Sequence, residues 1–231
     1  MPVDAVKEFL VPFSEIELSQ EDIIKEIGYK DTLPDDSIPG TIDRLLALLK
    51  KTVQPRYVFQ IHEGEIEGAS VHILNETFLT GPTITHLLEK SSSFALFAAT
   101  AGVEFEQILQ ECKRTEDDIL VNYLLDIMGT CIVEKTGDYM ERKLEEEIGA
   151  ELLHTHRFSP GYCNWRLTEQ RKIFSLLGNR PCGITLSDVC LMLPVKSISG
   201  IIGIGKEVKR KQYACQYCEL ETCYKRKKAT A

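Results

Sequence analysis

The sequence predicts an α+β fold, because helices and strands follow one another without the regular strand-helix-strand alternation of a doubly wound sheet. Two observations predict the mixture. Apolar residues recur at helical spacing along residues 115–148, and no proline follows until Pro160. Short alternating or continuous apolar runs at 57–61, 93–101 and 184–205 are typical of strands.

Size and composition favour a soluble globular protein. The chain has 231 residues, 43% of them hydrophobic and 27% charged, enough for one large domain or two small ones. No apolar run approaches the ~20 residues that a membrane span needs, and the N-terminus lacks the basic start and apolar core of a signal peptide. We therefore expect a cytoplasmic protein without a membrane partner. Its net charge of −8 argues against nucleic-acid binding.

The N-terminal segment, residues 1–54, is predicted to be helical. Residues 18–28 suit a short helix with Ser19 as its N-cap. Residues 32–40 are rich in proline and aspartate and predict a loop. Residues 42–52 then place leucines on one face of an amphipathic helix.

The core of the fold is predicted to span residues 55–212. Residues 57–61 alternate as a strand, and 65–74 suit a further strand or a hairpin. Gly81-Pro82 opens a helix that extends to about Lys90, since proline is tolerated in a first helical turn. Residues 93–101 are small and apolar, which favours a buried strand.

A long helix is predicted from Thr115 to Ile148, where Thr115 would cap an acidic first turn. At 1.5 Å per residue it would be ~50 Å long. Its apolar seam is expected to contain Ile119, Leu120, Tyr123, Leu124, Ile127, Met128 and Cys131. On this seam Glu134 would point toward the core, which is costly unless the carboxylate is paired or faces a wet pocket. Alternatively, a bend at Gly129 or a drift of the apolar face frees Glu134 into solvent.

The segment Arg157-Phe158-Ser159-Pro160-Gly161-Tyr162 is the most informative motif. Pro160 fixes its own φ and biases Ser159 toward an extended conformation, while Gly161 permits φ values closed to other residues. Such a loop exposes backbone N–H and C=O groups beside an arginine, and the arginine fork suits a carboxylate. The loop therefore predicts a ligand-binding site.

Three further motifs follow the loop in order. A helix carries Phe174-Ser175-Leu176-Leu177, and two apolar runs, 184–194 and 196–205, are predicted to be buried strands joined at Pro194. The runs contain a Leu-Ser-x-x-x-x-Met-x-Pro motif at 186–194 and a Ser-x-Ser-Gly motif at 197–200. Glycines in the second run are expected to permit close approach of another chain or ligand.

These four motifs together resemble the activation domain of cobalamin-dependent methionine synthase. The resemblance implies a twisted antiparallel sheet flanked by helices, one of them long. It implies that Arg157 binds the carboxylate of S-adenosylmethionine and that Ser159 and Gly161 offer backbone bonds to its adenine. Tyr162 would face the corrin ring, and Glu151 matches an acidic family position.

The implied function is reactivation of a cobalamin-dependent methionine synthase, in methionine biosynthesis, by reductive methylation with S-adenosylmethionine. The chain contains no Asp-x-His-x-x-Gly cobalamin motif, so we expect a stand-alone accessory component of the methyltransferase that acts in trans. The electron donor would be a protein such as flavodoxin or ferredoxin. Glu134 would bind the sulfonium or ammonium of the methyl donor, although the family's acidic helix position aligns better with Thr130.

A basic tail, residues 213–231, contains Cys215, Cys218 and Cys223. This spacing predicts a zinc or iron-sulfur site; no fourth ligand is evident nearby in the tail, but His154, His156 or Cys163 could supply it. Redox-active thiols and an unliganded tail are the alternatives. The rival function is a redox or metal protein whose tail reactivates another corrinoid methyltransferase. Of the other cysteines, Cys163 is open to either role, and four are expected in the core: Cys112, Cys131, Cys182 and Cys190.

Overall fold

The computed structural model describes residues 6–29, 37–115, 118–178 and 180–210. The helices are α1 Gln20–Ile27, α2 Ser37–Thr52, α3 Gly81–Leu87, α4 Val103–Thr115, α5 Ile119–Ile148 and α6 Gln170–Leu177, with 3-10 turns at Phe13–Ile16, Leu167–Glu169 and Pro181–Gly183. The strands are β1 Phe9–Leu10, β2 Arg56–Glu67, β3 Ser70–Ile73, β4 Glu76–Phe78, β5 Ser93–Thr100, β6 Leu153–His154, β7 Thr185–Leu186, β8 Met192–Leu193 and β9 Ser197–Gly205. Within these ranges no helix combines the length and the apolar character needed to cross a membrane.

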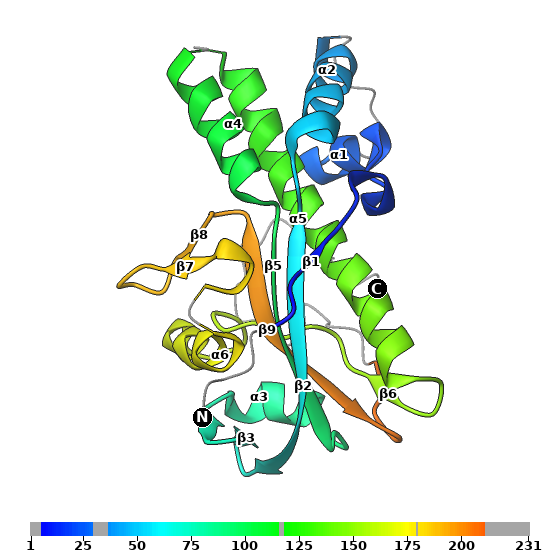
Figure 1. The fold of residues 1–231 in the computed structure, drawn as a ribbon, viewed down its shortest axis with the longest axis vertical. Helices are drawn as coiled ribbons and strands as arrows, with labels where there is room; N and C mark the ends of the chain where they lie inside the picture. The colour runs from blue at the N-terminus through cyan, green and yellow to red at the C-terminus, as the bar shows by residue number, and fades with distance from the viewer. Residues whose placement is uncertain (1–5, 30–36, 116–117, 179, 211–231) are drawn as a thin grey trace, which may run out of the picture. The chain divides into compact units, whose positions relative to one another are not determined.

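The main sheet has the strand order β4-β3-β2-β5-β9-β6, with β1 paired to β2 (Figure 1). The pairs β1–β2, β2–β3, β3–β4 and β6–β9 are all antiparallel. Strands β7 and β8 form a separate two-stranded sheet. The predicted α+β class, with an antiparallel sheet and one long helix, is therefore confirmed.

The chain divides into two compact units, and each unit draws on three separate stretches of sequence. The first contains residues 1–58, 98–144 and 177–198, and the second contains 59–97, 145–176 and 199–231. The strands β2, β5 and β9 contribute residues to both. The domain boundaries expected at residues 54 and 212 stay a prediction.

In the first unit, α1 packs against α2, and α2 also contacts α4 (Figure 1). The predicted cap of α1 is confirmed: the Ser19 hydroxyl accepts from the Asp22 amide at 3.1 Å, and the Asp22 carboxylate accepts from the Ser19 amide at 3.0 Å. Helix α2 begins at Ser37, within the predicted loop, because Pro39 falls in the first turn, where its missing N–H costs nothing.

The start of the long helix differs from the prediction. Thr115 ends α4, a helix that the sequence analysis did not assign, and so does not cap α5. The capping role belongs to Asp118, whose carboxylate accepts from the amides of Leu120 at 2.9 Å and Val121 at 3.3 Å. Helix α5 has 30 residues, about 45 Å at 1.5 Å per residue.

The buried face of α5 also differs from the predicted seam. Ile119 and Tyr123 are exposed, whereas the buried stripe follows Val121, Leu124, Leu125, Met128, Ile132, Thr136, Met140 and Leu144. Glu134 lies about 180° from Leu125 around the helix, and it is exposed. The expectation that Glu134 faces the core was wrong, and the alternative that the apolar face shifts away from it is confirmed.

The prediction that residues 184–194 form a buried strand was also wrong. Residues 184–194 form the short β7–β8 hairpin, closed by a turn in which the Ser187 amide donates to the Leu191 carbonyl at 2.9 Å. Four apolar side chains on alternate positions of this segment are exposed: Val189, Leu191, Leu193 and Val195. The second run is the buried strand β9, as predicted, because its apolar and glycine residues continue without a turn signal.

In the second unit, β2 and β3 form a hairpin in which Glu67 pairs with Ser70, and β3 also contacts α3. The glycines of β9 permit close packing of other segments of the same chain, whereas the approach of another chain or a ligand stays a prediction. A Cβ at Gly203 would collide with Ser91 and would lie 3.0 Å from Leu88 at the end of α3. Close packing of this kind holds the α3–β5 connection onto β9, where the Ser92 amide donates to the Ile204 carbonyl at 2.9 Å.

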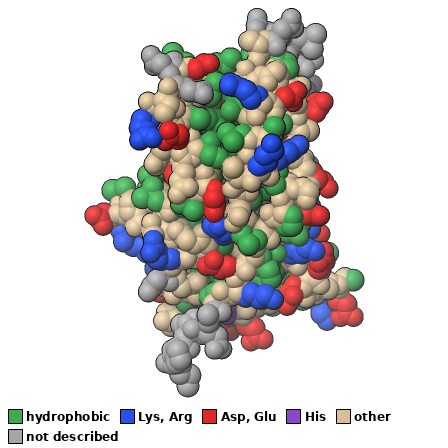
Figure 2. Space-filling model, turned by 45° about the horizontal axis from the view of Figure 1, so that its top comes forward, with side chains coloured by type: hydrophobic (Ala, Val, Ile, Leu, Met, Phe, Trp, Pro, Cys, Tyr) green, Lys and Arg blue, Asp and Glu red, His purple; other side chains and the backbone are tan. Residues whose placement is uncertain are grey.

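The surface carries charges of both signs. On the face shown in Figure 2, acidic and basic side chains are interspersed and separated by small apolar areas. This pattern gives no support to a continuous basic footprint for nucleic acid on that face.

Candidate functional site

The Arg157 loop lies in the second unit, where the chain runs antiparallel to β9 and then leaves it. Leu153 pairs with Gly205 and His154 with Ile204, and the Thr155 amide donates to the Gly203 carbonyl at 2.9 Å. Pairing resumes at Phe158, which exchanges two backbone hydrogen bonds with Ile201, of 2.9 and 2.8 Å.

The register between these points contains one extra residue. His156 and Arg157 together face only Ile202, because the partners on either side are Thr155 with Gly203 and Phe158 with Ile201. Two residues opposite one define a β-bulge, which bends the strand and redirects its side chains. The bulge therefore sets the direction in which Arg157 leaves the strand, and its side chain is half-buried there.

Pro160 ends the pairing. The next hydrogen-bonded pair would require an N–H from residue 160, and proline has none. Ser159 occupies the non-hydrogen-bonded position between Phe158 and Pro160, so the N–H of Ser159 points away from β9. Within the described part of the chain, its carbonyl accepts from the Tyr162 amide at 3.4 Å. Among the described residues no hydrogen bond of its own N–H or hydroxyl is found, so both can meet solvent or a ligand.

The turn after Pro160 is closed by its own backbone. The Gly161 amide donates to the Trp165 carbonyl at 2.7 Å, and the Trp165 amide donates to the Tyr162 carbonyl at 2.9 Å. Gly161 has a φ of 98°, in the region that favours glycine, as the sequence predicted. Its N–H is used within the turn and is therefore not offered to a ligand, in contrast to that of Ser159. The Tyr162 side chain is 60% exposed.

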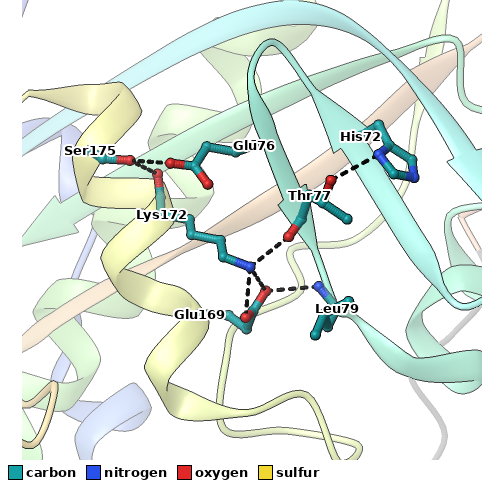
Figure 3. Close-up of polar contacts among 7 residues, drawn as sticks. All are labelled: His72, Glu76, Thr77, Leu79, Glu169, Lys172 and Ser175. Carbon is teal, nitrogen blue, oxygen red and sulfur yellow. Dashed lines mark hydrogen bonds and ion pairs between the residues drawn. The ribbon is translucent and has the colours of Figure 1, made fainter.

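The far side of the loop is anchored by a buried aromatic pair and a buried carboxylate. Trp165 is 1% exposed and meets the Phe78 ring edge-on at 6.5 Å. Glu169 accepts from the Leu79 amide at 2.8 Å and from the Lys172 ammonium at 2.9 and 3.0 Å. Figure 3 shows the contacts of Glu169 with Leu79 and Lys172.

The same cluster continues along α6. The Lys172 ammonium also donates to the Thr77 carbonyl at 2.6 Å, and the Ser175 hydroxyl donates to Glu76 at 3.1 Å (Figure 3). The Thr77 hydroxyl lies 3.0 Å from Nδ1 of His72. These bonds fix the helix that follows the Arg157 loop to the β3–β4 hairpin, so both ends of the loop are held.

Charged and titratable side chains gather along the strand that leads into the loop. Arg210 approaches His156 Nδ1 through its Nε at 3.5 Å and Glu145 through its Nη1 at 3.5 Å. Burial lowers the pKa of His156, and the charges of Arg210, His154 and Arg157 lower it further. Lowering of this pKa disfavours a second positive charge next to Arg157.

The structure brings together the predicted residues Arg157, Ser159, Gly161 and Tyr162 within one turn of chain. Glu151 is exposed and follows the end of α5. Glu134 belongs to the first unit, on the α5 face that carries Asp126 and Thr130, as an exposed carboxylate. The tail cysteines Cys215, Cys218 and Cys223 lie outside the described residues. Among those described, no group of three or more potential ligands could hold a metal ion.

Sequence reasoning missed two clusters. Lys196, with only 13% of its side chain exposed, contacts Asp126 at 2.9 Å and the Thr130 hydroxyl at 3.0 Å. The other is the His154–Glu145 pair, 2.8 Å apart. The first joins residues at least 66 apart and the second residues nine apart on different elements, so no helix or strand periodicity could have signalled either. Of the predicted core cysteines, Cys131, Cys182 and Cys190 are buried and Cys112 is half-buried.

The cysteine environment bears on reactivity at one position. Burial raises the pKa of the Cys182 thiol, and the nearby Glu8 carboxylate raises it further. The Cys182 amide donates to that carboxylate at 2.7 Å. A thiol held protonated in this way is a poor nucleophile, which agrees with a core role.

A separate hollow lies elsewhere in the second unit, between the β2–β3 hairpin and the α3–β5 connection. Its charged lining consists of Glu63, Glu65, His72, Glu89 and Lys90. It contains none of the predicted site residues. The Arg157 loop is therefore the candidate site that both motif and geometry support.

The described residues thus form an α+β domain with one long helix, in which a bulged strand places Arg157 at the start of a proline-glycine turn. The family described as vitamin B12 dependent methionine synthase, activation domain, matches residues 84–229, and the chain belongs to this family. The recognition made from the four motifs is thereby confirmed.

A solved structure supports the fold. The MetH reactivation domain, crystallised bound to AdoHcy, is similar over 88% of this chain and 79% of its own, with a TM-score of 0.63 and 16% sequence identity. At that identity the likeness concerns the fold alone. A comparison with curated proteins found no match.

Proposed function

We propose that this protein binds S-adenosylmethionine at the Arg157 loop and supports reductive methylation of a cobalamin-dependent methionine synthase. The observation that carries the proposal is the bulge between Thr155 and Phe158, which presents Arg157 beside the open N–H of Ser159. Membership of the activation-domain family supports it. A structural neighbour crystallised with AdoHcy, the demethylated form of this ligand, supports it further.

Each residue of the loop has a role in this proposal. The Arg157 guanidinium pairs with the ligand carboxylate, for which its planar fork is suited. Ser159 donates its N–H, and the exposed backbone at Gly161 leaves room for the adenine edge. Glu151, an exposed carboxylate in the same unit as the loop, is the proposed partner of the ligand's positive charge.

The reaction requires a cobalamin-bearing partner, and we propose that it is a separate polypeptide. An electron donor such as flavodoxin or ferredoxin would first reduce the partner's Co(II) cobalamin by one electron. S-adenosylmethionine, when bound, would then supply its sulfonium methyl group to the cobalt and leave as S-adenosylhomocysteine. The protein's own contribution is to hold the donor in position. The exposed ring of Tyr162 is the proposed contact with the corrin face.

Calorimetric titration with S-adenosylmethionine tests the site. Arg157→Ala should weaken binding by ~1.5–3 kcal/mol, the scale of a lost charge-assisted hydrogen bond. Arg166→Ala is the matched control, because Arg166 is exposed on the same loop and should leave the affinity unchanged. No heat of binding with the parent protein at millimolar ligand, or equal affinity in Arg157→Ala, contradicts the proposal.

Reactivation of oxidised methionine synthase tests the action in trans. With a reductant present, the protein should restore turnover only when S-adenosylmethionine is added. Tyr162→Ala should lower the rate while leaving ligand affinity intact, since its proposed contact is with the partner. Equal reactivation without S-adenosylmethionine would favour the rival redox function of the cysteine tail.

A further inference from the structure

His154 is a buried histidine with both ring nitrogens in contact with oxygen acceptors. Its Nε2 lies 2.8 Å from Glu145 Oε1, and its Nδ1 lies 2.7 Å from the Thr155 carbonyl oxygen. A carboxylate and a carbonyl only accept hydrogen bonds, so a ring that carries a proton on each nitrogen satisfies both. His154 is 6% exposed, while the Glu145 side chain is 51% exposed.

The Nδ1 contact changes the ladder between this strand and β9. In a regular antiparallel pair, the Thr155 carbonyl would accept from the Gly203 amide. Here that carbonyl faces His154, and the Gly203 amide donates to the Thr155 hydroxyl at 2.9 Å instead. The same hydroxyl donates to the His156 carbonyl at 2.8 Å. Thr155 is 1% exposed, so these bonds are not shared with bulk water.

The result is a relay of three hydrogen bonds, joined through the covalent frame of Thr155, from the end of α5 to the residue before Arg157. It passes from the Glu145 carboxylate through the His154 ring and the Thr155 carbonyl and hydroxyl to the His156 carbonyl. The relay occupies the position where the extra residue enters the strand. It therefore fixes the backbone of the bulge that sets the direction of Arg157.

We infer that Glu145, His154 and Thr155 position Arg157 for the carboxylate of the ligand. This inference rests on the proposed function of Arg157 and adds to it residues that do not touch the ligand themselves. Preorganisation of this kind raises affinity, because less ordering remains to be done on binding. The charged groups that contact the relay or face His156 are Arg210, beyond β9, and Arg157 itself.

The test uses two ligands that differ in one group: S-adenosylmethionine and decarboxylated S-adenosylmethionine, which lacks the partner of Arg157. His154→Leu should weaken binding of the first by about tenfold and leave the second unchanged. A variant that only disturbs the fold would weaken the binding of both ligands equally. His154→Gln places an amide N–H near the position of Nε2 and should recover part of the loss. Glu147→Gln, at an exposed neighbour of Glu145, is the control.

Thr155→Val, nearly isosteric with the native residue, removes only the hydroxyl and keeps the test valid if His154→Leu does not fold. It should also weaken carboxylate binding selectively. In the Arg157→Ala background the effects of both variants should vanish, because coupled residues are not additive. Equal weakening of both ligands, or additive effects with Arg157→Ala, overturns the inference alone. Failure of the parent protein to bind S-adenosylmethionine overturns the proposed function, and the inference falls with it.

Discussion

Replacement of Gly200 by alanine should disrupt the bridge that holds the Arg157 loop to β9. A Cβ at Gly200 would collide with the carbonyl oxygen of Phe158 and would lie 2.9 Å from its carbonyl carbon and 3.0 Å from the Phe97 ring. Two of these neighbours are backbone atoms, which cannot rotate away. The strand carrying Phe158 must therefore move, and the two hydrogen bonds between Phe158 and Ile201 weaken or break.

The magnitude follows from those two effects. Overpacking of a buried site costs about 1–3 kcal/mol, and each backbone hydrogen bond contributes about 1 kcal/mol net. We expect Gly200→Ala to lower the free energy of unfolding by about 3 kcal/mol, the middle of the range these terms allow. For a chain of this length that corresponds to a fall in Tm of roughly 6–12 °C. Urea unfolding followed by circular dichroism measures it.

Gly40→Ala is the matched control, because a Cβ there meets nothing within 4 Å and the residue lies in the first turn of α2. The same chemical change should raise stability there by about 0.5–1 kcal/mol, since alanine favours the helix. Gly200→Ala should also weaken S-adenosylmethionine binding, through the displaced bulge. Stability within about 0.5 kcal/mol of the parent, together with unchanged affinity, would refute the reasoning.

Three further predictions concern other parts of the chain. Glu169→Ala should lower the free energy of unfolding by about 2 kcal/mol, measured by urea unfolding, because the carboxylate is buried and its loss leaves the Lys172 ammonium without its ion-pair partner. Burial and nearby positive charges lower the pKa of His156 below 6.5 in the folded state. Below about pH 6.5 the unfolded state therefore binds more protons than the folded state, and stability falls as the pH drops. His156→Gln should flatten this fall in a pH series of thermal unfolding. Near-stoichiometric zinc or iron should be found by elemental analysis after anaerobic purification, and the double variant Cys215→Ser, Cys218→Ser should abolish it.

Each of these has a result that would contradict it. Unchanged stability in Glu169→Ala would mean that the cluster in Figure 3 does not anchor α6. An identical pH series in His156→Gln and the parent would exclude His156 as the group responsible. Metal-free protein with eight titrating thiols would favour an unliganded tail.

The sequence by itself determined the features that depend on neighbouring residues. The loop was predictable because the φ restriction of proline and the freedom of glycine act at their own positions, and Gly161 adopts a positive φ. The capping box at Ser19 was predictable because its two partners are three residues apart. The strand β9 was predictable because an uninterrupted apolar run has few other stable placements.

Tertiary structure decided which faces are buried. Helix α5 has two apolar faces, one with Ile119 and Tyr123 and the other with Val121 and Leu125. Only packing against other elements decides that the second face is buried. Residues 184–194 are apolar enough for a buried strand, yet a turn at Ser187 folds them into an exposed hairpin.

The site itself depended on contacts between distant segments. The bulge before Arg157 arises from the register against β9, which lies more than forty residues further along the chain. The relay through His154 requires Glu145 on another element. The backbone conformation of the loop depends on its own residues and could therefore be predicted from the sequence. The direction of the Arg157 side chain is set by hydrogen bonds that form only when the strands pair.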